Sequence, residues 1–248
     1  MDHIKDAINV NVLALKRTIG SANYFPIVVV ILIFTMVVDM LATLLFGMLA
    51  QVISFPFLWG VLRYLVDVAT LSLLMVALSK VLSKRSLDMR NFTDDWQRFM
   101  SPLMNTRFIF WLIEIVLSML SGALGQIPYL LLILGIAYNI LVSPMLESIY
   151  IAGEQGQDAL MFIIEFLKNN ILQWLPVLVL FPLIMSRIEL FSWSNILAGK
   201  DFSSLPRILI LYLLLAFVYI YKGHLFSILH NSSMRKRKFM GVMDNDDY

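Results

Sequence analysis

The sequence predicts an all-α integral membrane protein with six transmembrane helices. Of its 248 residues, 60% are hydrophobic and 15% are charged, and the mean hydropathy is +0.81. Soluble domains are about 45–50% apolar and about 25% charged, so these values exclude a soluble fold. Six apolar runs approach the roughly 20 residues that a helix needs to cross a bilayer, and they are continuous rather than alternating, which favours helices over a barrel. The runs cover residues 25–47, 53–78, 108–124, 128–150, 171–190 and 206–228.

Basic residues next to these runs predict the orientation of the chain. They gather in the two terminal segments and in the segment after the second run, whereas the short connections near residues 50–52 and 125–127 carry none. Since cytoplasmic loops carry the excess of Lys and Arg, both termini are expected in the cytoplasm. The residues are Lys5, Lys16, Arg17, Lys80, Lys84, Arg85, Arg90, Arg98, Arg107, Arg235, Lys236, Arg237 and Lys238.

Taken in order, the elements form a single polytopic domain of three hairpins, each preceded by an amphipathic interfacial helix. Residues 1–24 hold the first interfacial helix and 25–79 the first hairpin. A cytoplasmic loop with the second interfacial helix follows at 80–107, and 108–150 form the second hairpin. Residues 151–170 hold the third interfacial helix, 171–230 the third hairpin, and 231–248 the tail.

The three interfacial helices are predicted from apolar residues that recur at helical spacing on one face. Thr93 and Asp158 stand where they can cap the second and third helices. Each helix is expected to lie at the inner membrane surface before the chain turns into the bilayer. Their loose similarity fits either a threefold internal repeat or a shared physical constraint. The apolar faces are Ile4, Ile8, Leu15 and Ile19; Trp96, Phe99, Met100, Leu103 and Met104; and Leu160, Ile163, Ile164, Leu167 and Ile171.

The fifth run contains two prolines, Pro176 and Pro182. Proline removes a backbone donor and breaks the helical hydrogen-bond ladder. The run is therefore expected to be either a kinked crossing or a re-entrant segment.

One stretch before the fifth run resembles a known family. Residues 153–160 read GEQGQDAL, residues 166–170 read FLKNN, and Trp174 leads into the apolar run. This stretch is similar to a diffuse family of six-helix bacterial membrane proteins that includes the membrane region of glycerophosphodiester phosphodiesterases. The resemblance implies a bacterial cytoplasmic membrane protein, and it brings no catalytic motif, since no segment is long or polar enough to hold the soluble phosphodiesterase domain.

Ionisable residues inside the predicted crossings are the leading candidates for a functional site, because polar groups deep in lipid are energetically expensive. Asp39, Arg63, Asp67 and Glu114 qualify, with Asn139 as a neutral companion. Small and polar residues extend these positions into stripes that are expected to face the interior of the bundle. The stripes are Gly60, Arg63, Asp67 and Thr70; Arg107, Trp111, Glu114, Ser118, Ser121, Gly122 and Gly125; Gly135, Asn139, Ser143 and Glu147; and, more weakly, Tyr212, Tyr219, Gly223, Phe226 and His230.

Two interpretations of these residues stand. In the first they are structural: Arg63 pairs with Asp67 one turn away, and Glu114 bonds to a neighbouring helix. In the second, three carboxylates share one arginine at mid-depth. Because burial disfavours the charged form of a carboxyl group, one of these acids would hold a proton, and it could exchange protons or bind a cation during transport.

Other kinds of site are not expected. The chain has no cysteine, no Walker loop, no HExxH and no GxSxG motif. His224 and His230 do not share a helix face, so they are not expected to bind one metal ion together. Neither a metal, a cofactor nor enzymatic activity is therefore predicted. The net charge of +2 is too small to indicate nucleic-acid binding. The basic run Arg235, Lys236, Arg237 and Lys238 is a topology anchor and a candidate contact for lipid head groups.

These observations predict a non-enzymatic accessory or scaffolding subunit of a membrane assembly in the plasma membrane. Its partners would be membrane lipids and either another membrane protein or further copies of the chain. The alternative is a small transporter or lipid-handling protein that uses the mid-membrane acids, supported by the proline-containing fifth run. A membrane-embedded enzyme comes third.

Overall fold

The computed structural model describes residues 2–51, 55–84, 92–123, 128–189 and 205–232. Within these ranges the chain is helical and contains no strand. Six of the described helices are long and apolar enough to cross a membrane, so the predicted all-helical class and the predicted number of such helices are confirmed. The elements are α1 (Asp2–Gly20), η1 (Ala22–Tyr24), α2 (Phe25–Ala50), α3 (Pro56–Leu82), α4 (Phe92–Ala123), α5 (Pro128–Val142), α6 (Met145–Tyr150), α7 (Gly156–Glu189) and α9 (Leu205–Asn231).

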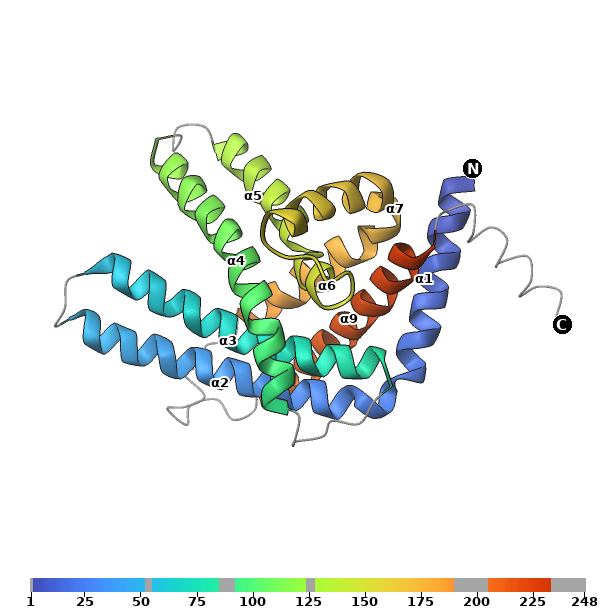
Figure 1. Ribbon diagram of the computed structural model, residues 1–248, viewed down its shortest axis with the longest axis horizontal. Helices are drawn as coiled ribbons and strands as arrows, with labels where there is room; N and C mark the ends of the chain where they lie inside the picture. The colour runs from blue at the N-terminus through green and yellow to red at the C-terminus, as the bar shows by residue number, and fades with distance from the viewer. Residues whose placement is uncertain (1, 52–54, 85–91, 124–127, 190–204, 233–248) are drawn as a thin grey trace, which may run out of the picture.

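Helix α9 forms the centre of the molecule. It packs against α1, α2, α3 and α7, and it is the most deeply buried of the six long apolar helices. Helices α2 and α3 lie side by side. Helices α4 and α5 form a second pair, and the two pairs diverge towards the end of α2 and the end of α4 (Figure 1). Helix α1 crosses the opposite end of the bundle, where the helices converge (Figure 1). The molecule is therefore compact at one end and open at the other.

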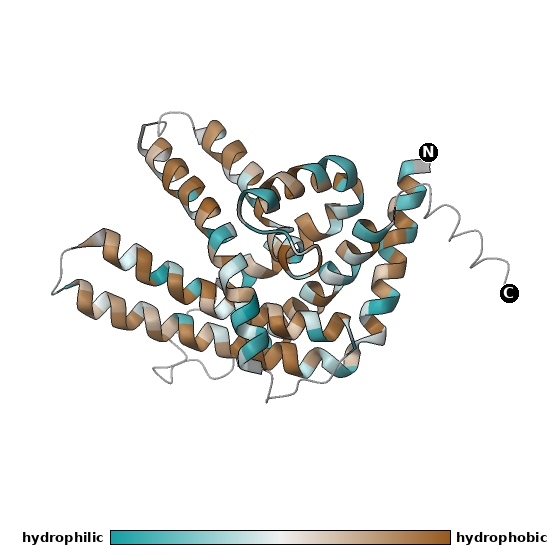
Figure 2. Ribbon diagram, in the orientation of Figure 1, coloured by the Kyte–Doolittle hydropathy of each residue, from teal (hydrophilic) through white to brown (hydrophobic). Residues whose placement is uncertain are grey.

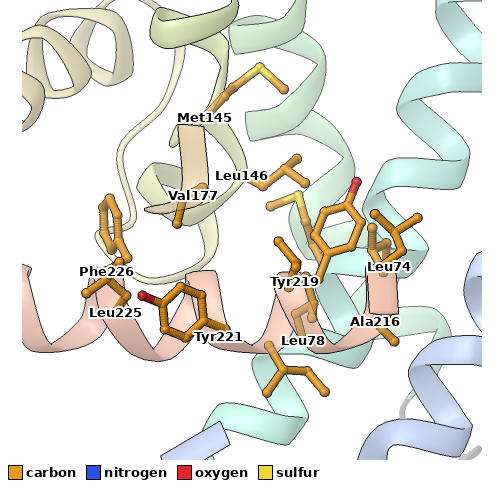
Figure 3. Close-up of a cluster of buried hydrophobic side chains, with 14 of the residues drawn as sticks. Leu74, Leu78, Met145, Leu146, Val177, Ala216, Tyr219, Tyr221, Leu225 and Phe226 are labelled. Atoms are coloured by element: carbon orange, nitrogen blue, oxygen red, sulfur yellow. The ribbon is translucent and has the colours of Figure 1, made fainter. Parts of the chain in front are cut away.

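The hydrophobic core lies at the compact end. Side chains of α3, α6, α7 and α9 meet there, including Leu78, Leu146, Val177 and Phe226 (Figure 3). Away from this core, the long helices are hydrophobic over most of their length (Figure 2). Many of their leucine, isoleucine and valine side chains are exposed. Such a surface suits contact with lipid tails, which replace water around a membrane bundle.

Two expected boundaries differ from the structure. The second interfacial helix, expected around residues 93–104, and the third crossing form one continuous helix, α4, which contains Pro102. The fourth crossing, expected as one run over 128–150, is divided into α5 and α6 at Ser143 and Pro144. Pro144 explains this division, because proline disfavours helical geometry in the residue before it and cannot donate to the helical ladder.

The predicted irregularity in the fifth crossing exists at a different residue. Pro176 and Pro182 both lie inside α7, and the non-helical backbone within this helix is at Asn170, with φ −130° and ψ 19°. The bend therefore comes six residues before the first proline, where the expected third interfacial helix meets the crossing. Beyond the bend, α7 continues as a helix to Glu189.

Candidate functional site in the membrane region

Arg63 of α3 is the centre of the first polar cluster. It forms an ion pair with Asp39 of α2, and its Nη1 donates a hydrogen bond to Thr43 Oγ1 at 2.7 Å. Its Nε lies 3.4 Å from Asp67 Oδ1, one turn further along α3. One guanidinium thus serves two carboxylates and ties α2 to α3.

The second cluster joins α4 to α5. Arg107 Nη1 lies 2.7 Å from Glu114 Oε1, two turns along the same helix. The Tyr138 hydroxyl of α5 donates to Glu114 Oε1 and accepts a hydrogen bond of 3.3 Å from Arg107. This carboxylate therefore has two donors.

The two clusters act on each other electrostatically. Both Arg107 and Glu114 lie close enough to Asp67 for their charges to influence it, as do Arg63 and Asp39. We call Asp39, Arg63, Asp67, Arg107 and Glu114 the charge row. The charge row contains three acids and two arginines. Its formal charge is therefore −1 (three negative charges and two positive) when all its members are ionised.

The acids of the charge row lie at a similar depth. At 1.5 Å per residue, Asp39 lies roughly 17 Å from the end of α2, Asp67 roughly 17 Å from the start of α3 and Glu114 roughly 14 Å from the end of α4. These helix ends all belong to the open side of the molecule (Figure 1). Because the hydrocarbon core is about 30 Å thick, all three acids fall near the middle of a bilayer that these helices cross.

The charge row is only partly covered by protein. The side chains of Asp39, Arg63 and Asp67 are 44%, 39% and 29% exposed. Figure 2 shows hydrophilic stretches within the otherwise hydrophobic α3 and α4, near the place where the two helix pairs diverge. Charged groups at this depth normally face a bundle interior or a water-filled cavity, so something other than lipid tails must cover them.

The structure brings together four of the five candidate residues and separates the fifth. Asn139 donates its amide hydrogen bond to Gly135 O of its own helix, at 2.9 Å, and is exposed. The expectation that three acids share one arginine is wrong, because Arg107 also joins the site. Its spacing of seven residues from Glu114 on one polar stripe was the signal for this pairing. The basic run Arg235, Lys236, Arg237 and Lys238 lies outside the described residues.

Sequence reasoning missed a buried ion pair at the compact end of the molecule. Lys222 Nζ of α9 lies 3.1 Å from Glu147 Oε2 of α6, and the two side chains are 5% and 0% exposed. The ammonium group also lies 5.4 Å from the ring centre of Phe181 and 5.7 Å from that of Tyr219. A lysine inside an apolar run was the available signal. The pair holds the short helix α6 against the central helix.

Comparisons with family models, curated proteins and solved structures found no match. The similarity to the membrane region of glycerophosphodiester phosphodiesterases therefore stays an expectation from the sequence.

The geometry singles out Asp67 within the charge row. Asp39 has a close ion pair with Arg63, and Glu114 is held by both Arg107 and Tyr138. For Asp67 the described residues provide one ion-pair contact, at the longer distance of 3.4 Å. Asp67 is therefore the acid of the charge row with the weakest ion-pair contact. No group of three His, Asp or Glu side chains that could hold a metal ion occurs in the described part of the chain.

Proposed function

We propose that the chain is a non-enzymatic small transporter or lipid-handling protein in which the Asp67 carboxylate takes up a proton or a small cation. The observation that carries this proposal is the composition of the charge row: two arginines neutralise two of its three acids, and Asp67 is left with the weakest contact. An intramembrane acid without a full counter-charge is typical of proton and ion pathways.

The proposal includes a topology. Three hairpins cross a bacterial cytoplasmic membrane, and both termini lie in the cytoplasm. The first and third hairpins are introduced by helical segments at the inner surface, which are α1 and the part of α7 before Asn170. The position of α1 across the compact end of the bundle supports this arrangement, as does the concentration of basic residues in the terminal segments and after the second crossing (Figure 1). The open side of the molecule then faces away from the cytoplasm, and the charge row lies at the membrane depth where the open side begins.

An accessory or scaffolding subunit is the second candidate. The exposed side chains of Asp39 and Arg63 favour it, because a polar helix of another membrane protein would cover them as well as water would. In that case the partner helix would dock on the exposed side chains of the charge row.

Carbodiimide labelling tests the proposed role of Asp67. Dicyclohexylcarbodiimide partitions into the bilayer and reacts with protonated carboxyl groups there, leaving an adduct that peptide mass analysis locates. We expect an adduct on Asp67 that forms more slowly as the pH rises. Asp67→Asn should abolish the labelling, whereas the matched variant Asp39→Asn should retain it. Absence of an adduct on Asp67, or equal labelling of Asp39, would overturn the proposal.

Co-purification separates the two candidates. The protein would be extracted in mild detergent and its associated chains identified by mass analysis. A transporter is expected to purify as copies of this chain alone, and proteoliposomes containing it should dissipate an imposed pH gradient faster than those containing Asp67→Asn. A different chain present in fixed ratio, together with equal rates for the two proteoliposome samples, would favour the subunit.

A further inference from the structure

A groove lies on the side of the molecule formed by α1, α7 and α9. It is an open groove of about 510 Å³, separate from the helices that carry the charge row. Its walls include Ile8 and Val12 of α1, Leu175 of α7 and Phe217 of α9. These side chains make the groove almost entirely apolar.

The polar groups in this groove already have partners. The Tyr221 hydroxyl donates to the Asn11 side-chain oxygen, which joins α9 to α1. Asn11 Nδ2 donates to Ala7 O at 2.7 Å and to Gln173 O at 3.1 Å. Since Asn11 and Tyr221 satisfy each other, the groove offers little to a polar ligand and favours an apolar one.

Helix α1 presents three different faces around this groove. Val10 and Ala14 are buried against the bundle. The neighbouring face is apolar but exposed, with Ile8 57% exposed and Val12 46% exposed. At 3.6 residues per turn, the exposed Lys5 and Lys16 lie along the outer edge of that apolar face. This order, from buried to apolar to basic, is that of a helix lying at a membrane surface.

We propose that the groove holds an acyl chain of a phospholipid, whose phosphate lies beside the basic edge of α1. The groove continues onto exposed leucines of α7 within its apolar crossing, so a lipid tail can enter it sideways from the bilayer. Lys5 and Lys16 supply the positive charge that complements a phosphate, with a preference for lipids of net negative charge. This site is independent of the charge row and of transport.

Lipid retention tests the proposal directly. Protein in mild detergent, stripped of lipid, would be titrated with phosphatidylglycerol and followed by native mass spectrometry. We expect one tightly held lipid per chain. Ile8→Trp fills the groove and should weaken this binding about tenfold or more, which corresponds to about 1.4 kcal/mol. Leu132→Trp, on an exposed position of α5 outside the groove, is the matched control and should bind as the unchanged protein does.

A second comparison tests the basic edge. The double variant Lys5→Gln and Lys16→Gln should bind phosphatidylglycerol more weakly and bind phosphatidylcholine unchanged. Arg98→Gln, at an exposed position of α4, which does not line the groove, should leave both affinities as they are. Binding that is equal in the Ile8→Trp and Leu132→Trp variants would overturn the proposal. So would a dimer that forms in place of the lipid complex and is lost in Ile8→Trp, because a second copy would then occupy the groove.

Discussion

At the scale of single residues, the molecule separates two kinds of charged group. The charge row is partly exposed at mid-membrane depth, whereas Glu147 and Lys222 are enclosed by protein. Breaking an enclosed pair leaves an uncompensated charge that the surroundings cannot solvate. The enclosed pair therefore matters for stability, and the partly exposed row is available for function.

Replacing one member of the enclosed pair should destabilise the protein strongly. We expect Lys222→Met to lower the free energy of unfolding by about 3–5 kcal/mol, because Glu147 then has no counter-charge. The double variant Glu147→Leu with Lys222→Met should recover most of this loss, since neither charge is left. Thermal unfolding in detergent measures both, with the exposed substitution Lys5→Met as control. A loss in the double variant as large as in the single one would show that packing, and not charge, makes the pair important.

Gly223 marks a close contact between α9, α6 and α3. A Cβ atom at this position would lie 2.6 Å from the Tyr150 hydroxyl and 2.9 Å from Leu82 Cδ1. We expect Gly223→Ala to destabilise the protein by about 1–3 kcal/mol through overpacking. Tyr150→Phe removes the clashing oxygen, which is buried and has no hydrogen-bond partner within the described residues, so it should partly rescue Gly223→Ala in the same unfolding assay. If the rescue fails, Leu82 is the more important obstacle.

At the scale of elements, the sequence located the crossings better than the ends of the helices. A bilayer imposes a minimum length of apolar chain, and the six predicted runs overlap the six long apolar helices. No comparable rule ends a helix at the membrane surface. The α4 helix therefore continues from its polar first turns through Pro102 into the crossing. Arg107, expected at the boundary between the cytoplasmic loop and the third crossing, lies in the middle of this helix.

The sequence predicted most members of the charge row but not all of their partners. Asp39, Arg63, Asp67 and Glu114 were predictable because charges are rare in apolar runs. The role of Tyr138 was not predictable, because tyrosine is common in membrane helices and only the approach of α5 to α4 gives it a carboxylate partner. Asn139, its neighbour in sequence, points its amide to its own helix instead.

The connection between α6 and α7 contains a backbone position that suits glycine. Gly153 has φ +80°, a conformation that other residues adopt at a cost, and no neighbouring atom would touch an added Cβ. Gly153→Ala should therefore destabilise the protein by about 1–2 kcal/mol through backbone strain alone. Gly153→Asn should lose less, because asparagine tolerates this conformation better. Equal losses for the two variants in thermal unfolding would contradict this explanation.

At the scale of the whole molecule, a compact end and an open end are joined by one central helix. Every long helix contributes to the compact end or to its immediate surroundings, whereas the α2 and α3 pair and the α4 and α5 pair separate towards the open end (Figure 1). The proposed transport site lies where the pairs begin to separate, and the proposed lipid groove lies beside the compact end. The two proposals therefore require opposite ends of the molecule to meet opposite membrane surfaces.

This arrangement can be tested because the chain contains no cysteine. We expect a single cysteine replacing Gln51, at the open end, to react with a membrane-impermeant maleimide added to intact cells. A cysteine replacing Lys84, at the end of α3 nearest the compact core, should react only after the cells are permeabilised. Both positions are exposed, so a difference in labelling reports the side of the membrane and not burial. The reverse pattern would place the termini outside and would turn the basic edge of α1 away from the cytoplasmic surface, whose anionic lipids it is proposed to bind.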